Sequence, residues 1–97
     1  MNTITGLMAT DRPARYAKQL ASHWATRGPA TEEGGATVLR WNTGQVILMR
    51  PEDGYLAVEV TVADDVDAAR FAQTVKEHLE RFGQRDELHV VWDADQP

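Results

Sequence analysis

Residues 63–92 have the sequence ADDVDAARFAQTVKEHLERFGQRDELHVVW, and this stretch decides the fold. From Val66 to Phe82 the apolar residues recur every three or four positions, which is the spacing of one face of a helix. Asp64-Asp65 is placed to cap the first turn, and Gly83 to end the helix in the left-handed conformation. Residues 88–92 then alternate as a short strand. The stretch therefore predicts a helix joined to a strand by a short polar turn.

The rest of the chain supplies strands that can pack against this unit. Residues 55–62 alternate apolar and polar side chains, the pattern of a half-buried strand. Residues 37–41 and 45–50 flank Asn42-Thr43-Gly44, a three-residue sequence typical of a hairpin loop. A first strand is expected over residues 3–9.

A second helix is expected between the first two strands. It begins after Thr10 or Asp11, carries an apolar stripe from Tyr16 to Trp24 and ends at Gly28-Pro29. The resulting order is β-α-β-β-β-α-β, with hairpins joining the central strands. We therefore predict the α+β class: a two-layer sandwich with both helices on one face of a mainly antiparallel sheet.

The two helices share a short motif. Ala14-Arg15-Tyr16-Ala17 aligns with Ala69-Arg70-Phe71-Ala72, and at the same offset His23 aligns with His78. Each matched pair occupies the same position relative to the apolar stripe of its helix. The match predicts a pseudo-twofold internal repeat.

Length and composition predict one domain over residues 1–97, with an ordered core over residues 3–92 and a polar tail over residues 93–97. A chain of 97 residues with 42% apolar content is large enough to fold alone. The sequence has no cysteine, which excludes disulfides, zinc–thiolate sites and thiol catalysis.

Charge and hydropathy limit the kinds of partner that the protein is expected to bind. No apolar run reaches the length of a membrane span, and the N-terminus lacks the pattern of a signal peptide, so we expect a cytoplasmic protein without a membrane partner. A formal charge of −5 argues against nucleic-acid binding, which needs a basic surface.

One sheet face is expected to lack helices. The run Val46-Ile47-Leu48-Met49 is apolar on both sides of its strand, and we expect Ile47 and Met49 to point outward, with Tyr55 and Val91 beside them. A shielded central strand is one interpretation of this pattern. A homodimer through the sheet is the sharper one, and a small apolar ligand is a third.

A second candidate surface is polar and consists of His23, His78, Arg81, Arg85 and Asp86. The two arginines are suited to clamp a carboxylate or phosphate, and the histidines to bind a metal ion or to transfer a proton. The simpler interpretation is structural, since histidines near helix ends favour the dipole and Arg85 can pair with the acids that follow it. No third metal ligand at a defined spacing is evident, so we expect no metal.

Two segments resemble the bacterial family named domain of unknown function 2218. They are HLERFGQRDEL at residues 78–88, followed by Val90 and Trp92, and ARYAKQL at residues 14–20, followed by His23-Trp24. The resemblance extends from about Thr3 to Trp92, with Gln84 standing where an apolar residue is expected. The family has no established activity. Similar domains are sometimes fused to siderophore-interacting flavoproteins, which implies an accessory role in iron handling.

These observations favour a non-enzymatic binding or interaction module without a cofactor, homodimeric and linked to iron–siderophore metabolism. The alternative is a small enzyme or metal-binding protein that uses His23, His78 and the Arg85–Asp86 turn. A third hypothesis is a structural partner of a larger flavoprotein.

Overall fold

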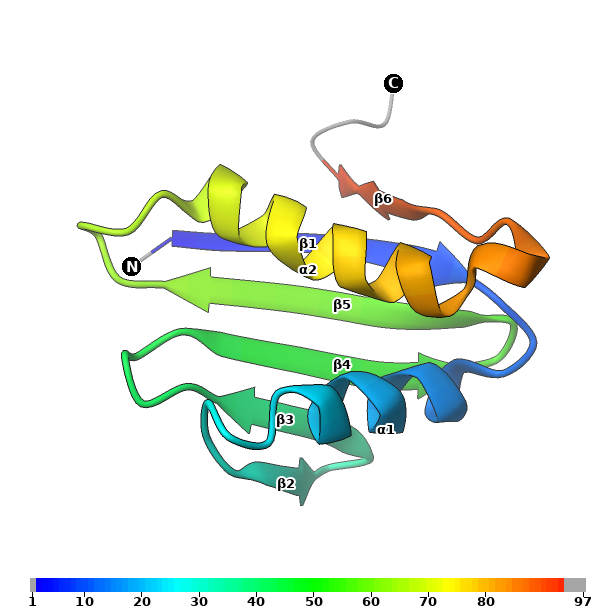
Figure 1. Cartoon of the computed structure of the whole chain (residues 1–97), viewed down its shortest axis with the longest axis horizontal. Helices are drawn as coiled ribbons and strands as arrows, with labels where there is room; N and C mark the ends of the chain where they lie inside the picture. Colours follow the sequence, from blue (N-terminus) through cyan, green and yellow to red (C-terminus); the bar gives the residue numbers. More distant parts are fainter. Residues whose placement is uncertain (1, 94–97) are drawn as a thin grey trace.

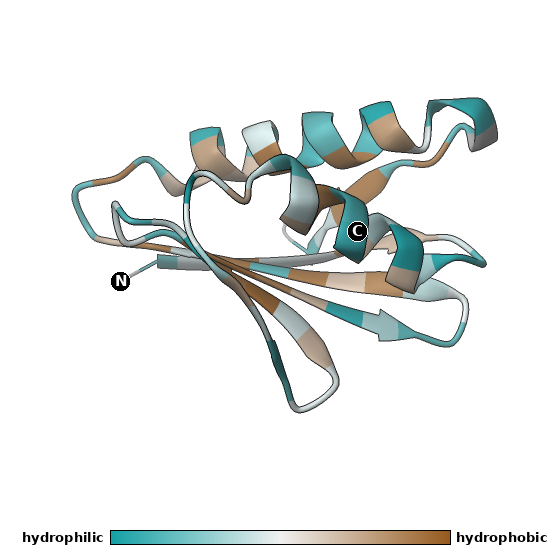
Figure 2. Ribbon diagram, turned by 60° about the horizontal axis from the view of Figure 1, so that its bottom comes forward, coloured by the Kyte–Doolittle hydropathy of each residue, from teal (hydrophilic) through white to brown (hydrophobic). Residues whose placement is uncertain are grey.

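The computed structural model describes residues 2–93, apart from the side chain of Asp86, and arranges them in two layers (Figure 1). Six antiparallel strands form one sheet in the order β2-β3-β4-β5-β1-β6. Both helices lie on the same side of the sheet, and no helix within residues 2–93 covers the other face (Figure 2). The predicted α+β sandwich is confirmed. The elements are β1 (Asn2–Ala9), α1 (Pro13–His23), β2 (Ala30–Glu33), β3 (Ala36–Arg40), β4 (Val46–Glu52), β5 (Tyr55–Val62), α2 (Ala68–Phe82), the 3₁₀ turn η1 (Gln84–Asp86) and β6 (Val90–Trp92).

Strand β5 lies at the centre of the sheet and alternates as predicted. Its even-numbered residues are buried under the helices and its odd-numbered residues are half-buried on the open face. Strand β4 pairs with it so that Ile47 is opposite Val60 and Met49 is opposite Val58. Because residues directly opposite each other share a face, Ile47 and Met49 also face the helices.

The prediction that Ile47 and Met49 point outward is therefore wrong. Both side chains are 0% exposed and belong to the core, while Val46 and Leu48 lie on the open face. A run of four apolar residues does not reveal which alternate pair is buried. The pairing register with β5 decides it, because a shift of one residue exchanges the two faces.

Helix α2 ends at Phe82, before Gly83, as predicted, but its start and the conformation of Gly83 differ from the prediction. The helix begins at Ala68, and its cap is Asp67, whose carboxylate accepts a hydrogen bond of 3.1 Å from the backbone N–H of Arg70. Asp64-Asp65 precedes the helix in a turn. Gly83 is not left-handed, with a φ of −96°; the chain instead continues into η1, and Glu87 takes the left-handed conformation with a φ of 55°.

Helix α1 ends at His23, five residues before the predicted stop at Gly28. Gly28 is needed for a different reason, which is the approach of this segment to β3. A Cβ atom at Gly28 would lie 1.8 Å from the carbonyl oxygen of Arg40. Only a residue without a side chain permits the two backbones to come so close.

The predicted internal repeat corresponds to matched burial on the two helices. Tyr16 and Phe71 are 5% and 7% exposed, and Ala17 and Ala72 are 1% and 2% exposed. The helices run in opposite directions over the sheet (Figure 1). The start of α1 therefore lies beside the end of α2, and this placement forms the candidate site described below.

Strand β2 extends the sheet by one strand beyond those predicted from the sequence. Glu33, the last residue of β2, forms an ion pair of 2.5 Å with Arg40 on β3. Its carboxylate also accepts a hydrogen bond from the hydroxyl group of Thr31. The hydrogen bond from Arg40, followed by that from Thr31, lowers the pKa of Glu33 to about 2.

We expect Arg40→Ala to raise the pKa of Glu33 from about 2 toward its ordinary value of 4.5. Since the folded state holds this pKa below that of the unfolded chain, the pair stabilises the fold above about pH 4.5. This contribution is lost as the pH falls toward 2. Carbon-detected NMR titration of the Glu33 carboxyl measures the change, with Arg70→Ala as a control that removes an equal charge from α2. An unchanged Glu33 pKa in Arg40→Ala would contradict the assignment.

Candidate functional site

A hollow of about 560 Å³ lies where the first turns of α1 meet the end of α2, and we call it the arginine pocket. Four guanidinium groups, two carboxamides and two aromatic rings line it. These residues are Arg12, Arg15, Tyr16, Gln19, Arg81, Phe82, Gln84 and Arg85. The volume lies within the range of about 300–1,000 Å³ that is usual for small-molecule sites.

The antiparallel packing of the helices creates this pocket. Arg12 and Arg15 come from the start of α1, and Arg81 and Arg85 come from the end of α2 and from η1. Tyr16 is buried beneath them and Phe82 is half-buried, so the aromatic residues anchor both helix ends to the core. The charged side chains are thereby held on opposite walls of one hollow.

The described residues that line the pocket carry four positive charges, although the whole chain carries a net charge of −5. Among the described residues, none of those lining the pocket is acidic, and no carboxylate forms an ion pair with these four arginines. The N-terminus of α1 adds to this charge, because it has no side-chain cap and no acidic residue in its first turn. The site is therefore suited to an anion.

The sequence suggested that Arg85 pairs with the acidic residues that follow it. Among the residues that the structure describes, no ion pair joins Arg85 to Glu87. The side chain of Asp86 lies outside the described residues. Arg81 and Arg85 both line the arginine pocket, as the polar candidate surface required.

Sequence reasoning missed Arg12 and Arg15 as site residues. Arg12 is the non-helical residue just before α1 and Arg15 lies in its first turn, so helical spacing gave no signal that the two residues share a site. Nothing in the sequence says that the start of α1 faces the end of α2.

The two histidines of the polar candidate surface do come together. Their ring centres are 5.1 Å apart, with planes tilted by 49°. The His78 ring also lies 4.6 Å from Trp24, and the Phe82 ring meets His23 edge-on at 5.6 Å. Phe82 lines the arginine pocket as well, so this ring is common to the pocket and to the histidine cluster. No group of three or more potential metal-ligating side chains occurs in residues 2–93.

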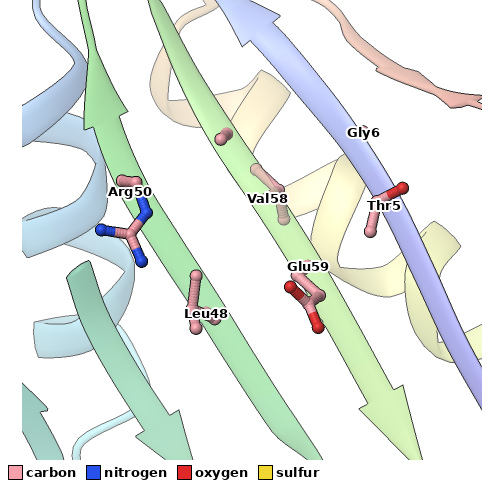
Figure 3. A pocket seen from close by; sticks show the side chains of 7 residues that line it. Thr5, Gly6, Leu48, Arg50, Val58 and Glu59 are labelled. Atoms are coloured by element: carbon pink, nitrogen blue, oxygen red, sulfur yellow. The ribbon is translucent and has the colours of Figure 1, made fainter. Parts of the chain in front are cut away.

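The open sheet face carries a smaller hollow of about 190 Å³, lined in part by Leu48, Arg50, Ala57 and Glu59. Figure 3 shows how Leu48, Arg50 and Glu59 project from β4 and β5. Charged groups of both signs are mixed with apolar groups here, so this hollow does not favour one class of ligand as the arginine pocket does.

Two of the four predicted residues of the open face, Tyr55 and Val91, do lie on it. Val91 is exposed by 38% and Tyr55 is half-buried. Leu7 and Leu48 take the places expected of Ile47 and Met49, since Leu7 is paired with Val91.

The comparisons with known proteins give a family and a fold. The model of a family described as uncharacterized proteins conserved in bacteria (DUF2218) matches residues 5–93. The NMR structure of PA4090 from Pseudomonas aeruginosa superimposes with a TM-score of 0.74 at 18% identity, covering 100% of both chains. A comparison with curated proteins finds no match. Among the described residues, no helix has the length and apolar content needed to cross a bilayer.

Trp24 connects the end of α1 to α2 and to the loop after β3, because its ring contacts both His78 and Trp41. We expect Trp24→Ala to lower the free energy of unfolding by about 3–5 kcal/mol, the usual cost of removing a buried aromatic side chain. Urea denaturation followed by circular dichroism measures the loss. His89→Ala, on an exposed residue, is expected to change the free energy of unfolding by less than about 0.5 kcal/mol. Equal stability of the two variants would contradict the central position of Trp24.

Proposed function

We propose that the chain, which belongs to the bacterial family DUF2218, is a non-enzymatic binding module for small polyanions. The observation that carries this proposal is the arginine pocket, where four guanidinium groups line one hollow and no other described residue of the lining is charged. A small polyanion is a molecule with two or more phosphate or carboxylate groups.

Guanidinium groups favour this class of ligand for geometric reasons. Each one presents parallel N–H donors that match two oxygens of a carboxylate or phosphate. Arg12 and Arg15 approach from one wall, and Arg81 and Arg85 from the other. Two anionic groups of one ligand are then bound at the same time, which favours a polyanion over a single anion. Gln19 and Gln84 supply neutral donors and acceptors between them.

The size of the hollow sets an upper limit on the ligand. About 560 Å³ accommodates a molecule of metabolite size. A nucleic-acid backbone is a poorer fit, because the remainder of the chain is acidic and repels a long polyanion.

The link to iron–siderophore metabolism and the flavoprotein partner rest on the family resemblance, and we retain them as the proposed context. Carboxylate-rich chelates are polyanions of the class that the pocket favours. We place this role in the cytoplasm, where small polyanionic metabolites are abundant.

We expect inorganic pyrophosphate and citrate to bind at low ionic strength, with weaker binding of inorganic phosphate. Amide resonances of Arg15 and Arg85 should shift together in an NMR titration. Arg15→Ala and Arg85→Ala should each weaken binding by about 10- to 100-fold, because each removes a charge-assisted hydrogen bond worth about 1.5–3 kcal/mol.

Arg70→Ala is the matched control, since Arg70 is exposed on α2 and lies outside the arginine pocket. It removes the same charge and should leave the affinity nearly unchanged. Arg85→Lys tests the geometry, because it retains the charge and loses the planar pair of donors. Equal loss in Arg70→Ala and Arg85→Ala would mean that the anion responds only to net charge, and the pocket would then be rejected.

We also propose a homodimer that forms through the open sheet face. Because Ile47 and Met49 are buried, its interface consists instead of Leu7, Leu48, Ala57 and Val91. These side chains are aliphatic and partly accessible. A face of this kind is suited to self-association when the same patch meets itself across a twofold axis.

We expect Leu48→Lys to shift the protein from dimer to monomer, because a charge placed in this patch must be desolvated in the dimer. Native mass spectrometry of protein purified without a metal-affinity column reports the subunit number. Gln73→Lys adds the same charge on exposed α2 and should leave the dimer intact. A wild-type protein that is monomeric at every accessible concentration would exclude this interface.

A further inference from the structure

The separation of the His23 and His78 rings matches the geometry of two ligands on one metal ion. Imidazole nitrogens bind such ions at about 2.0–2.1 Å, and two imidazoles at right or tetrahedral angles then have ring centres about 4.5–5.2 Å apart. The observed separation is 5.1 Å. The planes are tilted by 49°, which differs from the parallel offset arrangement of two stacked neutral rings.

One ring nitrogen of His78 is held by the backbone of its own helix. Its Nδ1 atom lies 2.8 Å from the carbonyl oxygen of Thr74. A carbonyl only accepts, so Nδ1 carries the hydrogen and Nε2 keeps a free lone pair in the neutral ring. A histidine that ligates a metal typically donates its other ring N–H to such an oxygen, which fixes both tautomer and orientation.

The surroundings hold both rings in place. The Trp24 ring lies 4.6 Å from His78 and 6.0 Å from His23, and Phe82 meets His23 edge-on. His23 and His78 also lie on two different helices whose apolar stripes are buried in the same core. The two donors are therefore brought together by the fold and not by a flexible loop, so little conformational entropy is lost when an ion binds.

We propose that His23 and His78 bind one divalent late transition-metal ion, with exogenous ligands completing its coordination. Imidazole donors suit Cu²⁺, Ni²⁺ and Zn²⁺, and among these Cu²⁺ binds most strongly to a given set of nitrogen donors. Both protein ligands are neutral, and the arginine pocket shares the Phe82 ring with the histidine cluster. This positive charge opposes a bare cation, so the open positions favour anions such as chloride or hydroxide.

The site differs from the polyanion site in its residues and in its ligand, and it does not rest on the proposed function. It departs from the expectation from the sequence that the chain binds no metal. That expectation was based on the lack of a third protein ligand, but two histidines with open positions are sufficient when small exogenous ligands are present.

The test is titration of the full untagged chain with Cu²⁺, followed by calorimetry and by electron paramagnetic resonance. We expect one equivalent to bind, with hyperfine structure from two nitrogen ligands. His23→Ala and His78→Ala should each weaken binding by at least about tenfold, because one of two linked donors is lost. The double variant should lose the stoichiometric site.

Two further variants keep the result interpretable. His23→Phe and His78→Phe preserve an aromatic ring in the cluster, and they should lose Cu²⁺ as the alanine variants do while retaining the wild-type fold. His89→Ala is the matched control, since His89 is exposed on another segment and should leave binding unchanged. Failure of the wild-type chain to bind Cu²⁺ would overturn the proposal, as would equal binding by the double variant or loss of binding in His89→Ala.

Discussion

Burial of two helical stripes on a single sheet face is the constraint on which the rest of this structure depends. Leu20 of α1 and Leu79 of α2 are fully buried against the sheet, as are Ile47 and Val60 within it. Each side chain of this size contributes about 1.5–3 kcal/mol when removed from water. Because both stripes must be covered by the same face, the helices lie side by side and antiparallel (Figure 1).

Both candidate sites are consequences of this packing. The antiparallel arrangement brings the start of α1 to the end of α2 and so gathers four arginines around one hollow. One turn further along, it brings His23 to His78. Each site takes its residues from both helices, so neither exists until the core has formed. Phe82 belongs to both sites, since it lines the arginine pocket and contacts His23, whereas Trp24 contacts the histidine pair.

The sequence predicted the elements well and their limits less well. The apolar periodicity of α2 was sufficient to identify the helix. The sequence did not show which aspartate caps it: Asp64-Asp65 was predicted, but the helix begins at Ala68 and Asp67 is the cap. Gly28 was interpreted as a helix end, whereas its role is the close approach to Arg40. The inward direction of Ile47 and Met49 was not visible either, since an apolar run on both sides of a strand has no preferred face.

What the sequence alone determined was the α+β class, the order of its main elements, the helical stripes and several residues of the polar surface. These follow from patterns of period two and period 3.6, which are properties of neighbouring residues along the chain. What only the tertiary structure decided was the register of β4 and the meeting of Arg15 with Arg85 and of His23 with His78. These residues are far apart in sequence, and they come together because two helices share one hydrophobic face.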